Sequence, residues 1–254
     1  MNSKWIRIDW IPTKMDEIVN IMKANGIKIL AILDHNTMNN TLPPNLDFNL
    51  SQWTEVVQNI MKTDAAKRVD AWEIWNEPNA DQFQFGYMNG DPQNYFEMLR
   101  VAHEIIDKNS PNALVIAAGL SPSKEFGDWS QWLTDFSNLS AQTYFDYQGV
   151  HLYDDTEINL RTINQTKQIM EVDYVWVTEI GKPSAPINDF SAEAQASYLV
   201  SNFQMLNNNV KCPVFWYQLK DEADDISNKE CNFGLFDVNN NSKAASNSFT
   251  MFTT

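Results

Sequence analysis

The sequence predicts an α/β fold in which one parallel sheet curves into a TIM-type (β/α)8 barrel, and three observations favour this class. The chain has 254 residues, close to the roughly 250 of a typical barrel of this kind. Short apolar runs alternate along it with amphipathic stretches, the pattern of successive βα units. No linker, repeat or low-complexity tract interrupts the chain, so we expect residues 1–254 to form a single domain.

Seven runs rich in β-branched and aromatic residues fit strands that are buried on both faces. They are Lys4–Asp9, Ile27–Leu33, Ala71–Trp75, Leu114–Ala118, Tyr147–Leu152, Tyr174–Thr178 and Pro213–Gln218. The expected helices are Lys14–Ala24, Leu50–Lys62, Gln93–Lys108, Ser130–Leu139, Leu160–Met170, Ala192–Asn207 and Ala244–Phe252. Ser191 is suited to cap the helix that follows it, because its hydroxyl can accept a hydrogen bond from a first-turn N–H. Seven strands leave such a barrel one strand short.

The balance of charge restricts the partners. Asp and Glu number 33 against 18 Lys and Arg, which gives a formal net charge of −15. A surface this acidic repels phosphate backbones and anionic lipids, which argues against nucleic acid and membrane partners and favours a neutral ligand. No apolar run reaches the roughly 18 residues of a membrane-spanning helix, and the start of the chain lacks the apolar stretch of a signal peptide.

Several metal and cofactor chemistries lack their residues in this sequence. Its three histidines, His35, His103 and His151, form no His-x-His pair, so a histidine-rich metal centre is not expected. Neither the dinucleotide-binding pattern nor the P-loop pattern occurs among the eight glycines, and a Gly-x-Ser-x-Gly elbow is also absent. The sequence therefore predicts a protein without a cofactor.

Two further features allow alternatives. An acidic cluster fits a solvated loop, with calcium binding as the weaker alternative because no regular ligand spacing appears; it comprises Asp221, Glu222, Asp224 and Asp225. Cys212 and Cys231 fit two buried free thiols, with a single disulfide as the alternative.

The most informative segment ends an apolar strand in Asn76-Glu77-Pro78. Pro78 stops the strand because proline lacks the N–H that a parallel ladder needs. Glu77 therefore lies at the carboxyl end of a strand, which is the end that carries the chemistry in barrel enzymes. Aromatic neighbours such as Trp72 and Phe83 would partly desolvate this carboxyl group, as a general acid requires.

A second strand ends in the same way, in Thr178-Glu179-Ile180-Gly181. Strand alternation is expected to place Val175, Val177 and Glu179 on one face, and likewise Glu73, Trp75 and Glu77 on the earlier strand. Both sets would then point into the barrel. Two carboxyl groups on one barrel rim are what glycoside hydrolysis needs, one to protonate the leaving oxygen and one to attack the anomeric carbon or activate water.

At these residues the sequence resembles the retaining glycoside hydrolases of the large (β/α)8 clan with two catalytic glutamates, and it is most similar to glycoside hydrolase families 39 and 5. Asn76-Glu77-Pro78 matches the fourth strand of that pattern and Thr178-Glu179-Ile180-Gly181 the seventh. Arg7 matches the arginine of the second strand, His151-Leu152-Tyr153 the His-x-Tyr of the sixth, and Trp216 the aromatic platform of the eighth. The resemblance extends over most of the chain, and five matches in strand order make it specific.

The resemblance implies two catalytic residues. Glu77 would be the acid/base and Glu179 the nucleophile of a double displacement. Arg7 and Tyr153 would keep the Glu179 carboxylate ionised and oriented, since a nearby arginine lowers a carboxylate pKa.

The resemblance also implies residues that bind the substrate. Asn76 would hydrogen-bond the 2-hydroxyl group of the sugar. His151 would contact the substrate or the acid/base, and Trp216 would stack under the sugar in the first subsite.

Other residues have structural interpretations beside functional ones. Glu73 lies deeper in its strand than Glu77, which favours a buried partner of Arg7 over a catalytic acid. Asp34 and His35 end a strand and fit either a sugar contact or a turn. Four aromatic residues that follow strand ends fit sugar subsites or core packing equally well; they are Trp10, Phe83, Tyr87 and Trp129.

One part of the family pattern has no counterpart. Counting back from Glu77, Ile27–Leu33 is its third strand and Lys4–Asp9 its second, so the first strand and helix are missing. Either the sequence is truncated, or the barrel is naturally reduced and the gap is covered by loops, the tail or a second subunit. Because open strand edges usually must be paired or covered, we expect an incomplete barrel or self-association into a homo-oligomer at that edge.

Together these features predict a retaining β-glycosidase that hydrolyses a neutral oligo- or polysaccharide without a metal or cofactor. The alternatives are a catalytically inactive carbohydrate-binding barrel and a transglycosylase that uses the same residues. The two carboxyl groups should lie about 5–5.5 Å apart for retention and about 6.5–9.5 Å apart for inversion. A polymeric substrate would suggest an extracellular protein, although the sequence shows no signal peptide.

Overall fold

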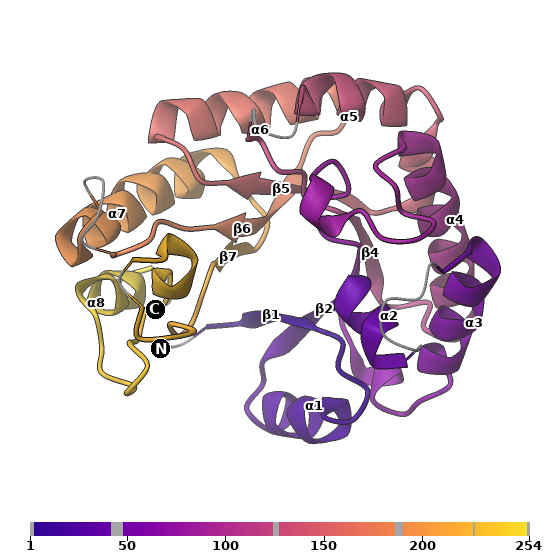
Figure 1. Cartoon of the computed structure of the whole chain (residues 1–254), viewed down its shortest axis with the longest axis horizontal. Coiled ribbons are helices and arrows are strands. Elements are labelled where there is room, and N and C mark those ends of the chain that lie inside the picture. Colours follow the sequence, from indigo (N-terminus) through magenta and orange to yellow (C-terminus); the bar gives the residue numbers. More distant parts are fainter. Residues whose placement is uncertain (1–2, 42–47, 124–126, 186–189, 226, 253–254) are drawn as a thin grey trace.

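The computed structural model describes residues 3–41, 48–123, 127–185, 190–225 and 227–252. These residues form seven parallel strands that neighbour one another in chain order and curve into a barrel (Figure 1). The strands are β1 Trp5–Asp9, β2 Lys28–Leu33, β3 Ala71–Ile74, β4 Leu114–Ala117, β5 Tyr147–Leu152, β6 Val175–Ile180 and β7 Val214–Trp216. All seven predicted strands are present, so the predicted fold class is confirmed.

Helices connect the strands on the outside of the barrel (Figure 1). They are α1 Met15–Ala24, α2 His35–Thr41, α3 Leu50–Met61, α4 Pro92–Asn109, α5 Trp129–Ser137, α6 Thr156–Met170, α7 Ala192–Asn209 and α8 Ala244–Thr250. Ser191 caps α7 as predicted, because its side chain accepts a hydrogen bond from the N–H of Ala194. The sequence analysis missed α2, whose residues His-Asn-Thr-Met-Asn-Asn-Thr contain no apolar residues at helical spacing.

The barrel is open between β1 and β7. Among the described residues, β1 pairs only with β2, and β7 pairs only with β6. Across this opening, the ring centroid of Trp5, the first residue of β1, lies 5.0 Å from that of Trp176 and 6.4 Å from that of Phe215. Side-chain packing thus takes the place of a backbone ladder there, and the prediction of an incomplete barrel is confirmed.

The sheet separates the core into an outer and an inner part. Two large apolar clusters lie between the strands and the surrounding helices, one on the side of α3 and α4 and one on the side of α7 and α8. Inside the barrel, a small cluster forms a floor; its buried members are Leu30, Ala71, Ile116, Trp176 and Phe215. Polar and charged side chains occupy the barrel above this floor, so the candidate site rests on a packed base.

A β-bulge in β6 changes which residues face the barrel. Val177 lies opposite Val150 of β5, whereas Glu179 lies opposite the next residue, His151, so Thr178 is an extra residue on the β6 side. Val175 and Val177 pack in the outer core, while Glu179 contacts groups inside the barrel. The prediction that Val175, Val177 and Glu179 share one face is therefore wrong, because the bulge turns only Glu179 inward.

The end of β3 departs from alternation as well. Glu73 faces the barrel, but Trp75 packs in the outer core against Phe48 and Trp53. Its backbone has a φ of 72°, a left-handed conformation that a residue with a side chain rarely adopts. Trp75 therefore does not share the face of Glu73, as alternation predicted.

Two simpler expectations can also be compared with the structure. No helix in the described ranges is both long and apolar enough to cross a lipid bilayer. Cys212 and Cys231 are half-buried free thiols, so the free-thiol alternative holds and the disulfide does not form.

Candidate active site

Arg7 donates hydrogen bonds to three side chains inside the barrel. Its Nε donates to Glu73 Oε2 at 2.5 Å, its Nη1 to Glu179 Oε1 at 2.5 Å, and its Nη2 to Asn76 Oδ1 at 2.9 Å. Burial opposes the charge of the guanidinium, but Glu73 and Glu179 outweigh it and raise the pKa of Arg7. Glu73, which is fully buried, is thus the partner of Arg7 that the sequence predicts.

Glu179 is held as a carboxylate from two sides. Arg7 binds its Oε1, and the Tyr153 hydroxyl donates a short hydrogen bond to its Oε2. Burial alone would raise the pKa of Glu179, but the charges of His151 and Arg7 and the bond from Tyr153 outweigh burial and lower it. A buried carboxylate that stays ionised can act as a nucleophile.

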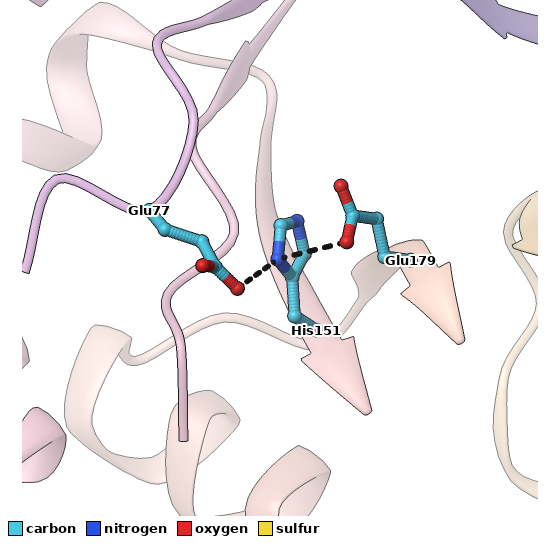
Figure 2. A group of neighbouring side chains, drawn as sticks. All are labelled: Glu77, His151 and Glu179. Atoms are coloured by element: carbon cyan, nitrogen blue, oxygen red, sulfur yellow. Dashed lines mark hydrogen bonds and ion pairs between the residues drawn. The ribbon is translucent and has the colours of Figure 1, made fainter. Parts of the chain in front are cut away.

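Glu77 lies on the opposite side of His151 from Glu179 (Figure 2). The His151 Nδ1 is 2.8 Å from Glu77 Oε1 and 3.5 Å from Glu179 Oε2. Burial opposes the charge of His151, but the two glutamates outweigh this effect and raise the pKa of its ring. The Glu77 backbone is in the left-handed region, with φ at 41°, and its N–H donates to the carbonyl of Gly119 at 3.1 Å.

These three side chains also form the only set of metal-ligand type in the described part of the chain. One ligand atom from each of Glu77, His151 and Glu179 lies within 4.8 Å of the other two. Hydrogen bonds and the Arg7 ion pair already account for these contacts, so the geometry does not call for an ion. The acidic cluster at Asp221 does not form such a set; Asp221 instead binds Lys243 Nζ through both carboxylate oxygens, at 2.8 and 3.0 Å.

A large cleft of about 1280 Å³ opens above the two glutamates. Arg7, Asn76, Glu77, Tyr153 and Glu179 line it, and the buried His151 lies just beneath. Polar residues from the ends of β1 and β2 line one wall; they are Asp9, Asp34, His35 and Asn36. The cleft thus meets the requirement of a site in which a ligand lies over both carboxyl groups.

The aromatic residues left open by the sequence divide into two groups. Phe83 and Trp129 line the cleft. Trp10 is buried against Trp72, with ring centroids 5.0 Å apart, and Tyr87 packs against the outer core. Core packing is therefore the role of Trp10 and Tyr87.

Trp216 is not where the sequence analysis expected it. Its ring faces α7, with its centroid 6.3 Å from that of Tyr198 and 6.4 Å from that of Phe203, and it does not line the cleft. The next residue, Tyr217, lines the cleft instead, and its ring packs against Phe233 at 5.4 Å. The predicted platform at Trp216 is therefore wrong, because the chain turns the next side chain inward.

Gly119 is a residue of the site that the sequence analysis missed. It follows β4, its N–H donates to Glu73 Oε1 at 3.3 Å, and its carbonyl accepts from Glu77. A β-carbon at Gly119 would lie only 2.2 Å from Cδ2 of His151, so a side chain there would displace the ring. A single glycine after a strand gives no sequence signal for this contact, which depends on folding.

An open barrel with two glutamates at strand ends, one bound to arginine and both next to one histidine, has the pair of carboxyl groups that glycoside hydrolysis needs. The sequence agrees with this, because residues 43–249 match the family described as the glycosyl hydrolase catalytic core. The chain belongs to this family.

Solved structures of similar fold belong to the same class. A family 39 glycoside hydrolase from the gut symbiont Bacteroides cellulosilyticus WH2 has a TM-score of 0.72 at 23% identity, over 95% of this chain and 56% of that one. A GH5_18 protein from Bifidobacterium longum subsp. infantis has a TM-score of 0.69 at 14% identity, over 98% of this chain and 69% of that one. No curated protein matches the chain.

The comparison also bears on length. This chain spans 56% of the family 39 structure and 52% of a glucosidase from Croceicoccus marinus, to which it is 16% identical over 94% of its own length, with a TM-score of 0.69. It therefore corresponds to about half of these relatives.

Proposed function

We propose that this protein is a retaining β-glycosidase that hydrolyses a neutral oligo- or polysaccharide by double displacement. The observation that carries the proposal is the different environment of the two glutamates. Glu179 is bound by Arg7 and Tyr153 and kept ionised. Among the residues that the structure describes, Glu77 forms hydrogen bonds only with the ring of His151 and with the backbone of its own loop and of Gly119. One carboxyl group is thus arranged to attack and the other to exchange a proton.

The reaction has two steps in this geometry. In the first, Glu179 attacks the anomeric carbon while Glu77 protonates the leaving oxygen, which gives a glycosyl ester on Glu179. In the second, Glu77 takes a proton from water, the water attacks the same carbon, and the Glu179 carboxylate leaves. The close approach of the two side chains, with oxygens within 4.8 Å, supports retention, for which about 5–5.5 Å between carboxyl groups is typical.

Asn76 is placed to recognise the sugar next to the reacting carbon. Its Oδ1 accepts from Arg7, which fixes the orientation of the amide. Its Nδ2 group can then donate to the 2-hydroxyl of a sugar in the cleft that Asn76 lines. A hydrogen bond to this hydroxyl strengthens as positive charge develops on the sugar ring in the transition state.

The cleft supports a substrate of several sugar units. Its volume of about 1280 Å³ exceeds the roughly 300–1,000 Å³ of common small-molecule pockets. Phe83, Trp129 and Tyr217 line it and offer flat faces for stacking on pyranose rings. The net charge of −15 favours a neutral polymer over an acidic one.

A reducing-sugar assay across β-glucan, mannan, xylan and aryl β-glycosides tests the proposal. Wild type should cleave at least one substrate, Glu179→Gln should lose at least about a thousandfold in kcat, and the exposed control Glu157→Gln should match wild type. Proton NMR of the first product should show the β-anomer. An α-anomer would overturn the double displacement, and binding without cleavage by folded wild type would replace the enzyme with a carbohydrate-binding barrel.

A further inference from the structure

Two buried polar atoms beneath the active site have no hydrogen-bond partner among the described residues. They are Nε2 of His151 and the hydroxyl oxygen of Thr178, and both residues are fully buried. A buried polar group without a partner costs about 1–3 kcal/mol, so two in one place require an explanation. The His151 atom is the ring nitrogen that does not face the glutamates.

The two unpartnered atoms lie close to one another. A β-carbon on Gly119 would be 2.4 Å from His151 Nε2 and 2.8 Å from Thr178 Oγ1, so both atoms surround the same point. The site has room for them because Gly119 and the facing Gly149 lack side chains; a β-carbon on Gly149 would lie 3.0 Å from Thr178 Oγ1. No hydrogen bond joins the two atoms in this structure, so the Thr178 side chain or the ring must turn toward the other to form one.

The bulge in β6 explains why Thr178 is in this place. Thr178 is the extra residue that turns Glu179 into the barrel, and the same backbone step directs its side chain toward Gly119 and Gly149. Thr178, the extra residue that turns Glu179 inward, therefore also lies near the Nε2 side of the His151 ring.

We propose that Thr178 is a positioning residue for His151: its hydroxyl is the partner of Nε2 and thereby keeps Nδ1 directed at Glu77 and Glu179 while the ring gains or loses a proton. This inference rests on the proposed function, since it concerns how the two glutamates exchange protons. Thr178 itself touches neither the substrate nor the reacting atoms.

A hydroxyl group is suited to this role because it can both donate and accept. It can donate to the bare Nε2 of a neutral ring and accept from the N–H of a charged ring. The charged groups around the ring are Glu77, Glu179 and Arg7, and the two glutamates raise its pKa against the effects of burial and of Arg7. A charged ring also needs an acceptor on its far side, and Thr178 is the side chain that supplies one.

Nitrogen-15 NMR of the histidine side chains tests this directly. The chain has only three histidines, so His35→Gln and His103→Gln suffice to assign the His151 signals. Thr178→Val, which keeps the shape of the side chain and removes the hydroxyl, should lower the pKa of His151 by about one pH unit, because a bond to a charged group is stronger than one to a neutral group. Thr178→Ser, which keeps the hydroxyl, should restore it.

Kinetics provide a second readout on a substrate that wild type cleaves. The pH–rate profile of Thr178→Val should shift on its basic side in the same direction as the His151 titration, with about a tenfold loss of kcat, while Thr178→Ser stays near wild type. A folded Thr178→Val variant whose His151 titrates like wild type would overturn the inference. So would a wild-type spectrum in which Nε2 shows no hydrogen bond.

The two proposals fail separately. If the His151 titration shifts as expected but no substrate is cleaved, the positioning role stands and the glycosidase proposal falls. If Glu179→Gln abolishes measured hydrolysis but Thr178→Val leaves the His151 titration unchanged, only the role of Thr178 is overturned.

Discussion

Replacement of Asp34 by asparagine should stabilise the protein at pH 8 and have little effect at pH 4.5. Asp34 is only 2% exposed, and burial together with the neighbouring charge of Asp9 raises the pKa of its carboxyl group from 3.8 to about 7. The folded state therefore holds this proton more tightly than the unfolded state. The stability that results is complete below about pH 4 and is lost as the pH rises through about 7.

The size of the effect follows from the shift. A rise of about three pKa units, at roughly 1.4 kcal/mol for each unit, corresponds to about 4 kcal/mol. This is an upper limit, because part of the shift comes from the neighbouring charge of Asp9 rather than from burial. Asparagine keeps an oxygen for the Thr37 N–H, which donates to Asp34 Oδ1 at 3.1 Å. We therefore expect Asp34→Asn to gain about 2–4 kcal/mol at pH 8.

Urea unfolding followed by tryptophan fluorescence at pH 4.5, 6 and 8 measures this gain. Asp64→Asn is a suitable control, because Asp64 is an exposed aspartate that pairs with Lys67 and should show no comparable gain. If Asp34→Asn changed the free energy of unfolding equally at pH 4.5 and pH 8, or lowered it at pH 8, Asp34 would not be buried as a neutral acid.

Three further predictions follow from the site. Arg7→Lys should lower kcat at least about a hundredfold, because one ammonium group cannot reach Glu73, Glu179 and Asn76 together; steady-state kinetics at the wild-type level would contradict this. Tyr153→Phe removes a hydrogen bond that lowers the pKa of Glu179, so the acid side of the pH–rate profile should move to higher pH by about one unit, and an unmoved profile would exclude this role. Trp216→Ala should lower the free energy of unfolding by about 3 kcal/mol and leave KM unchanged, whereas Tyr217→Ala should raise KM. Thermal unfolding and steady-state kinetics measure the two effects. A raised KM for Trp216→Ala and an unchanged KM for Tyr217→Ala would show that Trp216 is the platform.

The sequence predicted the fold well because its strands are nearly continuous apolar runs. Strands buried on both faces show this pattern without help from tertiary contacts, and all seven were found. The helix α2 was missed because its asparagine-rich residues carry no helical pattern; it begins directly after β2, at the wall of the cleft.

The site was predicted in its residue types but not in all of its directions. Glu77 and Glu179 stand at strand ends, and Pro78 and Gly181 mark those ends in the sequence. Their inward orientation, however, depends on a bulge at Thr178 and on the left-handed backbone of Trp75, neither of which alternation can anticipate. The contact between Gly119 and His151 joins two strands and has no local signal at all.

The same lack of a local signal explains the error at Trp216. Alternation assigns a face from position along a strand, but β7 contains only three residues. A difference of one residue at its end exchanges an outer-core side chain for one in the cleft, and Trp216 and Tyr217 are both aromatic. Only the packing of Trp216 against α7 decides between them.

The ion pair between Arg7 and Glu179 has a mechanical consequence. Arg7 lies on β1, whose outer edge has no described partner, and Glu179 lies on β6, so their bond fastens the two sides of the open barrel together. In the proposed glycosyl ester Glu179 carries no charge, so its ion pair with Arg7 is weakened in every catalytic cycle. The ring contacts of Trp5 with Trp176 and Phe215 do not depend on the charge of Glu179 and remain across the opening. Each turnover would thus weaken the ion pair between the two sides of the open barrel and then restore it.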